Sequence, residues 1–163
     1  MVKKAIWGAV IAVVLTAGGA TAAVASSAAP ASSHRSQTID LVARQTQARL
    51  LVLAAPGHGP VGNQIVTTDD IYRQAGKVGH DATVCQIMAD LGQAGARFQC
   101  AATVSLPEGQ LTVQGLATLT ETGNQPFTLA ITGGTGAYRT AHGQAQVTAV
   151  SPTEQRYTLT VIR

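Results

Sequence analysis

Large aromatic side chains are scarce in this chain, where Phe, Trp and Tyr together make up only 4% of the residues. An amphipathic helical period is also lacking, which argues against a helical fold. After the first residues the aromatic groups are only Phe98, Phe127, Tyr72, Tyr138 and Tyr157. Because so few bulky groups are available to plug the interior of a β-structure, the composition favours an internal cavity over a solid core.

An excess of positive charge is missing from most of the chain. Of its 11 basic residues, Lys3 and Lys4 lie in a segment that we expect to be removed, which leaves nine against 8 acidic residues. No stripe of basic residues remains to bind the phosphates of a nucleic acid, so we expect no nucleic-acid partner. The glycine-rich residues 133–136 lack the Gly-Lys-Ser/Thr element of a phosphate-binding loop. No nucleophile elbow is present to arrange a hydrolase triad.

The N-terminal segment has the pattern of an export signal. Residues 1–4 carry two lysines, residues 5–21 are almost wholly apolar, and Ala23-Val24-Ala25 fits a cleavage site. We therefore predict a signal peptide over residues 1–25, typical of bacterial export. The mature protein is then secreted, either extracellular or in the cell envelope, and free of the membrane. The alternative is an uncleaved anchor, since the apolar run is long enough to span a bilayer.

The chain has only two cysteines, Cys85 and Cys100. In an exported protein such a pair is normally oxidised, so we predict a disulfide. Counting back from the turn at residues 92–95 places the two cysteines opposite each other on the arms of a hairpin. The alternative is a reactive thiol. No third thiol or cluster of histidines accompanies the pair, so we expect no metal site.

Alternating aliphatic and polar residues predict an all-β domain over residues 38–163, after a flexible lead-in at residues 26–37 that is rich in Ala, Ser and Pro. Turn signals divide the domain into about eight strands, and that spacing is typical of a sandwich or a barrel. Periodicity leaves both architectures open. Alternation covers residues 38–44 and then 48–54, and the further expected strand segments are 64–72, 78–89, 96–105, 110–120, 126–132, 144–150 and 155–162.

The glycine-rich stretch carries a resemblance to a known family. Residues 130–138, Ala-Ile-Thr-Gly-Gly-Thr-Gly-Ala-Tyr, resemble the A-I-T-G-G-[ST]-G-x-[FY] signature of plant allene oxide cyclases. Residues 133–143 resemble the G-G-T-G-x-F-R-x-A-R-G run of dirigent proteins, and residues 69–72 and 113–115 match further elements of the two groups. The domain is thus identified as a member of the allene oxide cyclase barrel superfamily. The resemblance implies an eight-stranded antiparallel β-barrel that forms a homo-oligomer, either a dimer or a trimer.

The family also implies a function. Its cyclases steer ring closure of an allene oxide, and its dirigent proteins steer phenoxy coupling, in both cases by holding a reactive conformer without a cofactor. The partner expected here is therefore a small hydrophobic molecule, whose cyclisation or stereoselective coupling the barrel steers. Two alternatives remain: a non-catalytic carrier of a hydrophobic metabolite, and a structural oligomer of the cell envelope.

The resemblance points to catalytic and ligand-binding residues on the first two strands. Asp40 occupies the place of the carboxylate on the first strand of the family, although Val42 stands where the cyclases have Asn. Inside an apolar lumen Asp40 would act as an acid, a base or an anionic stabiliser. Asp70 and Tyr72 share one face of a strand and would form a polar, ligand-binding rim. The alternatives are a solvent-facing Asp40, and a turn that contains the acidic pair Asp69-Asp70.

The other candidate catalytic residues, Tyr138, Arg139 and His142, follow the glycine turns. An arginine there can bind a carboxylate with two hydrogen bonds, and a histidine can shuttle a proton near neutral pH. The alternative is that these side chains only hydrogen-bond to loop carbonyls.

Overall fold

The computed structural model describes residues 35–74, 76–120 and 125–163. The predicted signal peptide over residues 1–25 and most of the predicted lead-in lie outside the described residues. Within those described ranges, no helix is long and apolar enough to cross a membrane.

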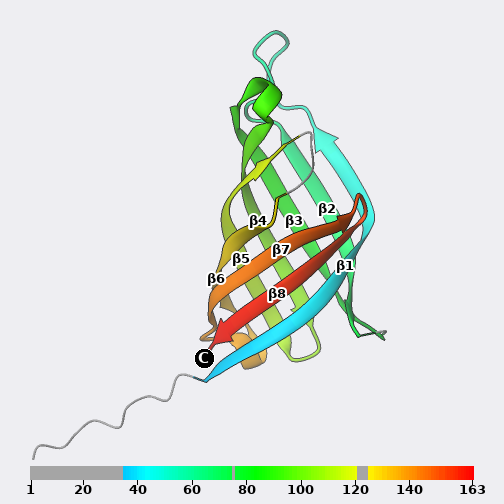
Figure 1. Cartoon of the computed structure of the whole chain (residues 1–163), viewed down its shortest axis with the longest axis vertical. Coiled ribbons are helices and arrows are strands. Elements are labelled where there is room, and N and C mark those ends of the chain that lie inside the picture. The colour runs from blue at the N-terminus through cyan, green and yellow to red at the C-terminus, as the bar shows by residue number, and fades with distance from the viewer. Residues whose placement is uncertain (1–34, 75, 121–124) are drawn as a thin grey trace, which may run out of the picture. The chain divides into compact units, whose positions relative to one another are not determined.

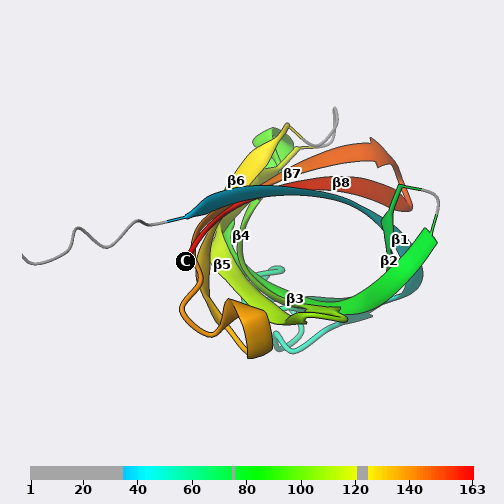
Figure 2. The same cartoon turned by 90° about the horizontal axis from the view of Figure 1, so that it is seen from below.

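Eight antiparallel strands close into one barrel, which confirms the predicted fold and decides between barrel and sandwich. Each strand pairs with the next along the chain, and β8 pairs with β1 to complete the ring (Figure 1, Figure 2). Two short 3-10 turns, η1 (Gly92–Ala94) and η2 (Gly136–Tyr138), lie at opposite ends of the barrel. The strands are β1 (Ser36–Leu51), β2 (Gln64–Arg73), β3 (Gly76–Asp90), β4 (Ala96–Leu106), β5 (Gly109–Leu119), β6 (Phe127–Gly134), β7 (His142–Ser151) and β8 (Glu154–Ile162).

The first strand is longer than its sequence pattern indicates. The pattern alternates over residues 38–44 and again over 48–54, whereas β1 runs unbroken from Ser36 to Leu51. Its pairing with β2 shifts register between Gln45 and Gln47, as at a β-bulge. A bulge inserts an extra residue and bends a strand without ending it. The polar residues that interrupt the alternation therefore mark this irregularity and not a loop.

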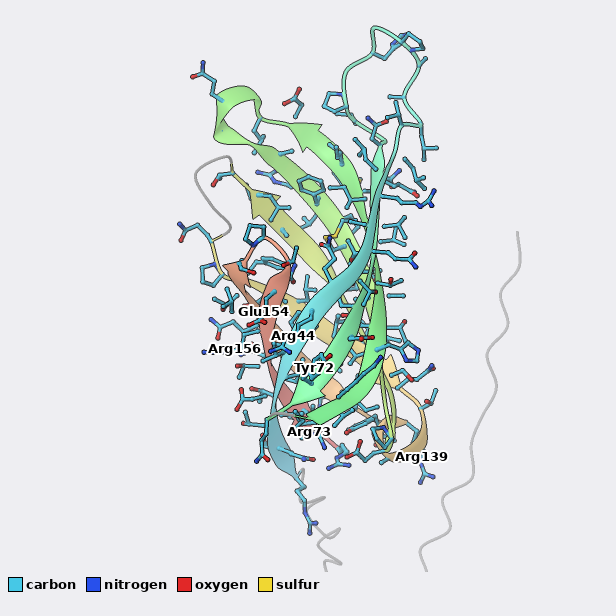
Figure 3. All side chains as sticks on the ribbon, turned by 90° about the vertical axis from the view of Figure 1, so that its right-hand side faces the viewer. Arg44, Tyr72, Arg73, Arg139, Glu154 and Arg156 are labelled. Atoms are coloured by element: carbon cyan, nitrogen blue, oxygen red, sulfur yellow. A yellow bond between two sulfur atoms is a disulfide. The ribbon has the colours of Figure 1, made fainter. Side chains whose placement is uncertain are left out.

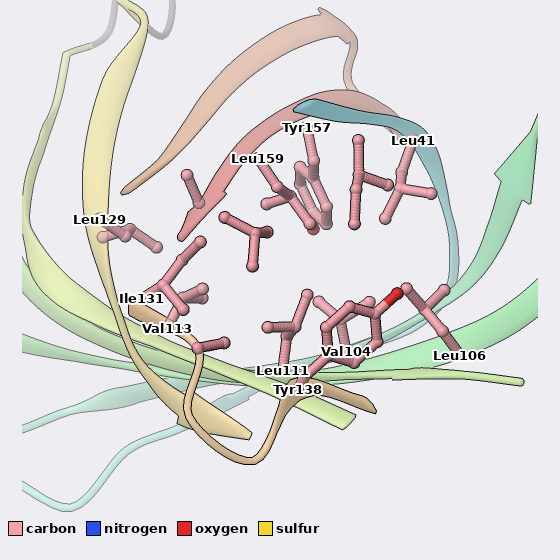
Figure 4. Packing of buried hydrophobic residues seen from close by; sticks show 14 of the residues in the cluster. Leu41, Val104, Leu106, Leu111, Val113, Leu129, Ile131, Tyr138, Tyr157 and Leu159 are labelled. Carbon is pink, nitrogen blue, oxygen red and sulfur yellow. The ribbon is translucent and has the colours of Figure 1, made fainter. Parts of the chain in front are cut away.

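Alternation along the strands directs apolar side chains into the lumen. Ile39, Leu41 and Ala43 of β1 are buried, while Asp40 and Arg44 between and after them are exposed. At the end of the barrel near η2, such inward residues pack into one continuous cluster, in which Tyr157 and Leu159 point towards Val104 and Leu111 (Figure 4). We call this end, closed by Tyr138 of η2, the packed half of the barrel.

The glycine-rich stretch closes the packed half, as a connection between two strands. Gly134 ends β6, and a Cβ atom there would lie 2.3 Å from the carbonyl oxygen of Gln110. Gly136 begins η2 with φ +58°, a conformation that favours glycine. These two glycines let the chain turn under the barrel close to β5, and so place Tyr138 beneath the lumen.

Candidate functional site

The half of the lumen on the side of η1, which we call the hollow half, is incompletely filled, although Ile87, Phe98, Cys100 and Ala117 form a second, smaller core cluster there. This half contains a cavity of about 210 Å³, which we call the lumen cavity. Tyr157, Leu159, Val104, Val113 and Leu129 belong both to the packed cluster and to the cavity lining, so they form the boundary between the two halves. The full lining is Gln45, Ile65, Thr67, Asp69, Thr83, Cys85, Cys100, Ala102, Val104, Val113, Ala117, Leu119, Phe127, Leu129, Ala145, Val147, Gln155, Tyr157 and Leu159.

The cavity has one polar and one apolar wall. All of its polar lining residues come from β8, β1, β2 and β3, whereas β4, β5, β6 and β7 contribute only apolar side chains and Cys100. The polar residues are Gln45, Thr67, Asp69, Thr83, Gln155 and Tyr157. A molecule in this cavity would therefore meet hydrogen-bonding groups along one side only.

Two buried carboxyl groups and a tyrosine stand at the base of the polar wall. Asp69 on β2 and Asp81 on β3 are direct cross-strand partners, and their exposed fractions are only 5% and 1%. Tyr157 on β8 reaches them across the lumen, and its hydroxyl donates to Asp81 Oδ2 at 2.9 Å. Charged groups are seldom buried unless they are paired, so this arrangement constrains the protonation of both acids.

Burial and mutual repulsion raise the affinity of these acids for protons. Burial, followed by the charge of Asp69, raises the pKa of Asp81 to about 7. Burial also raises the pKa of Asp69. The pKa of Tyr157 is well above its usual value, first through burial and then through the negative charges of Asp81 and Asp69, so its hydroxyl remains a donor. Two adjacent carboxyl groups of this kind share one proton near neutral pH.

The acid pair keeps acceptor capacity. Within the described residues, no donor group faces the buried Asp69 Oδ1 and Asp81 Oδ1, apart from the proton that the two carboxyl groups share. Asp69 lines the cavity, while Asp81 lies behind it and is tied to Tyr157. Asp69 is therefore the group that can exchange a proton or a hydrogen bond with a molecule in the cavity, and Asp81 can hold the second charge or proton.

The predicted disulfide is confirmed. Cys85 of β3 and Cys100 of β4 are direct cross-strand partners joined by an S–S bond of 2.04 Å. Both residues line the cavity, and the described residues include no free cysteine. The bridge thus fastens the wall of the hollow half where β3 meets β4, and the alternative of a reactive thiol is excluded for the oxidised protein. The same described ranges hold no group of three or more His, Cys, Asp or Glu placed to bind a metal ion.

Asp40, the leading candidate from the sequence, lies on the outer wall. Its side chain is exposed, and its Oδ1 accepts a hydrogen bond of 2.8 Å from the hydroxyl of Thr158 on β8. Because Ile39 and Leu41 on either side point inward, alternation turns Asp40 away from the lumen. The structure does not bring Asp40 near the lumen cavity.

Asp70 and Tyr72 also lie on the outer face of the barrel. Asp70 forms an ion pair of 2.7 Å with Lys77. The guanidinium of Arg44 lies 4.5 Å from the centre of the Tyr72 ring and pairs with Glu154 at 3.0 Å, as Figure 3 shows for this part of the surface. Asp40 and Tyr72 are brought together only as lining of an outer groove of about 520 Å³. Asp70 and Tyr72 lie on the same face of β2, as predicted, but this is the outer face of the barrel.

Tyr138, Arg139 and His142 gather at the closed end of the barrel, away from the cavity. Tyr138 is buried beneath the packed half, and burial raises the pKa of its phenol. Arg163 lies over its ring, 5.6 Å from the centroid. Arg139 is exposed, and His142 Nδ1 is 3.3 Å from the carbonyl oxygen of Thr140.

Sequence reasoning did not select Asp69, Asp81 and Tyr157. The signal that identifies Asp69 is the phase of β2, because Ile71 is fully buried and Asp69 stands two residues before it. Asp81 and Tyr157 have no local motif. They become recognisable only when the register places Asp81 opposite Asp69 and the barrel closes through β8.

Comparisons with known proteins agree with this architecture. The family model of the allene oxide cyclase barrel like domain matches residues 40–162. Among curated proteins, none matches this chain.

Several solved structures share the fold. A pyocyanin demethylase is 27% identical, with a TM-score of 0.67, and the match covers 77% of this chain and 99% of that one. AbnU, an exo-specific intermolecular Diels-Alderase, is 16% identical with a TM-score of 0.63, and the match covers 80% of this chain and 99% of the other. The pterocarpan synthase dirigent protein GePTS1 is 16% identical with a TM-score of 0.62, over 80% of this chain and 86% of its own.

Proposed function

Since this chain belongs to the allene oxide cyclase barrel family, we propose that it is a secreted barrel whose lumen binds a small, largely apolar molecule and steers its cyclisation or rearrangement without a cofactor. One observation carries the proposal: the carboxyl pair Asp69 and Asp81, with Tyr157, stands at the base of an otherwise largely apolar cavity. The residues that act are thus different from the candidates Asp40, Tyr138, Arg139 and His142.

The acid pair supplies a proton donor and acceptor where a reaction needs one. A general acid or base works best when its pKa lies near the working pH, and the pKa of Asp81 is raised to about 7. In our proposal Asp69 contacts the bound molecule and exchanges a proton with it. As charge develops on the molecule, Asp81 takes up or releases the proton that it shares with Asp69. Tyr157 is a positioning residue that holds Asp81 Oδ2 through its 2.9 Å hydrogen bond.

The two-sided lumen orients the molecule. Its apolar body would pack against β4–β7, and its polar edge would face Gln45 and Asp69, which are cross-strand neighbours on β1 and β2. Holding one conformer in this way removes orientational freedom before the reaction begins. A reaction on a small molecule is supported by the similar barrels, because one is a demethylase of pyocyanin and another is a Diels-Alderase, which forms a ring.

A non-catalytic carrier is the second candidate function. The observation that favours it is the closed end of the barrel. There, Tyr138 and the packed half close off the lumen cavity on that side. A blind cavity of this kind retains an apolar guest well. In that case the acid pair would only recognise the polar edge of the guest.

Native mass spectrometry of the protein purified from its own host tests both candidates. We expect a copurified small molecule in the wild-type protein, which is then identified after denaturation. Incubation of that molecule with fresh protein separates an enzyme from a carrier, because a carrier returns it unchanged. The same spectra test the signal peptide, since retention of Met1 would exclude cleavage, and they report whether the protein is a dimer or a trimer.

Variants then test the acid pair. With the identified molecule, Asp69→Asn and Asp81→Asn should lower turnover by about 100-fold or more, the usual contribution of a general acid or base. Asp70→Asn is the matched control, since it removes the neighbouring carboxylate on the outer face. If Asp69→Asn and Asp70→Asn had the same turnover as the wild type, the acid pair would have no part in the reaction.

A further inference from the structure

We propose that Ala102, Ala117 and Ala145 form a size filter that admits molecules of about two fused rings into the lumen; this inference rests on the proposed function. The three alanines lie on β4, β5 and β7, and all of them line the cavity. They belong to the apolar wall, across the lumen from Gln45 and Asp69. The size of their side chains therefore determines how much space is left between the two walls.

The inward positions of β5 show how the space arises. From the closed end, these positions hold Leu111, Val113, Gly115 and Ala117 in turn, and Leu119 stands at the end of the strand. The side chains thus become smaller from the closed end towards the hollow half. Protein interiors are normally filled to the density of organic crystals, and an unfilled space is destabilising. The small residues thus keep room for a guest at the expense of stability.

Gly115 makes room of a different kind and is not part of the filter. A Cβ atom on Gly115 would lie 3.1 Å from Leu129 Cδ2, so this glycine accommodates a protein side chain. Gly115 is also absent from the cavity lining. Ala117 and Ala145 also pack in the two core clusters, but all three alanines border the cavity, where a larger side chain would take space from the guest.

The volume of the cavity indicates the class of guest. An engineered apolar cavity of about 150 Å³ holds one benzene ring, and the lumen cavity measures about 210 Å³. A somewhat larger molecule, of about two fused rings, therefore fits. A hydroxyl group on its edge would reach the polar wall at Gln45 and Asp69, which suggests aromatic alcohols as probes.

Binding of phenol, 2-naphthol and 2-anthrol by the purified protein tests the filter. We expect the wild-type protein to bind 2-naphthol more tightly than phenol, since the larger ring system buries more apolar surface, and more tightly than 2-anthrol, which exceeds the cavity. Ala117→Leu should weaken binding of 2-naphthol by at least about tenfold, because added methylene groups occupy its place, while phenol keeps its affinity. Ala101→Leu is the matched control, since Ala101 is the exposed neighbour of Ala102 on β4. It should leave all three affinities unchanged.

Two further variants guard against a folding defect. Ala102→Val adds less volume than leucine and should weaken 2-anthrol more than 2-naphthol. Leu119→Ala enlarges the cavity and should strengthen binding of 2-anthrol. If the wild type binds 2-naphthol and folded Ala117→Leu and Ala102→Val bind it equally well, the size filter is wrong and the proposed function stands. If the wild type binds none of the three probes, binding in the lumen is itself wrong, and the filter with it.

Discussion

The packed half and the hollow half of the barrel are built from the same eight strands, but their inward side chains differ. In the packed half Leu111, Leu159 and Val161 fill the lumen and are fully buried. In the hollow half, alanines, threonines and a disulfide line the lumen beside Ile65, Leu119 and Phe127, and a cavity of about 210 Å³ remains. A barrel of eight strands has an interior just wide enough for packed side chains or for one small ligand. This chain uses both solutions, one at each end.

The difference teaches where chemistry can be placed in such a barrel. Tyr157 belongs both to the packed cluster and to the cavity lining, its hydrogen bond places Asp81 at this boundary, and Asp69 lines the cavity. Preorganised polar groups in an apolar surrounding act more strongly on developing charge than groups in water. The packed half therefore supplies stability and position, and the hollow half supplies space.

The largest expected effect comes from hollowing the packed half. Leu111→Ala should lower the free energy of unfolding by about 2 to 5 kcal/mol, because it leaves a void among residues that are already close-packed. Leu119→Ala removes the same atoms in the hollow half, where the side chain borders the cavity, and should cost less than half as much. Urea denaturation of both variants measures the difference. Equal losses would mean that the two halves do not differ in packing.

The disulfide should contribute the next largest effect. Cys85 and Cys100 are separated by 15 residues, and closing a loop of that length stabilises a protein by about 3 kcal/mol. The double variant Cys85→Ser, Cys100→Ser should lose this amount in urea denaturation. Reductant should weaken the wild-type protein to a similar extent and leave the double variant unchanged. An unchanged midpoint for the reduced wild type would mean that the hollow half does not depend on its bridge.

The acid pair should make stability depend on pH. The pKa of Asp81 rises from 3.8 in its ordinary state to about 7 in the folded protein, so folding favours its protonated form. The contribution of Asp81 to the free energy of unfolding is fully present below about pH 4 and is lost as the pH rises towards and through 7. Over this range the free energy of unfolding should fall by on the order of 2 to 4 kcal/mol.

Asp81→Asn tests the source of that pH dependence. The amide stays neutral at every pH, so the variant should lose much less stability than the wild type between pH 4 and pH 8. Asp70→Asn, on the outer face, should keep the wild-type profile. Thermal unfolding followed by circular dichroism across this range makes the comparison, and parallel profiles for the wild type and Asp81→Asn would contradict a protonated acid at the boundary.

Much of the fold follows from local sequence rules. Alternation predicted the strands, the glycines at residues 133–136 indicated the connection between β6 and β7, and counting from a turn placed Cys85 opposite Cys100. Each of these inferences depends on residues close together in the chain. The irregular middle of β1 was missed because a bulge and a loop have similar polar sequences.

The site was harder to predict because it depends on strand phase and on distant partners. Asp69 and Asp70 are adjacent, and a shift of one residue exchanges their faces. Burying a carboxyl group is unfavourable by default, so nothing local favours Asp69 for the interior. Asp81 and Tyr157, which make that burial tolerable, are separated by 76 residues and meet only when the barrel closes.

The smallest expected effect lies on the outer wall, at the residue that the family resemblance favoured. Asp40→Asn should change the free energy of unfolding by less than about 1 kcal/mol, because the exposed amide oxygen can still accept the hydrogen bond from Thr158. It should also leave the affinity for 2-naphthol unchanged, since the wall of the barrel separates Asp40 from the cavity. Asp69→Asn, measured beside it, replaces the carboxyl group that faces the cavity and should alter that affinity. If Asp40→Asn weakened binding and Asp69→Asn did not, the ligand would sit in the outer groove beside Tyr72, and the contrast between the two halves of the lumen would concern stability alone.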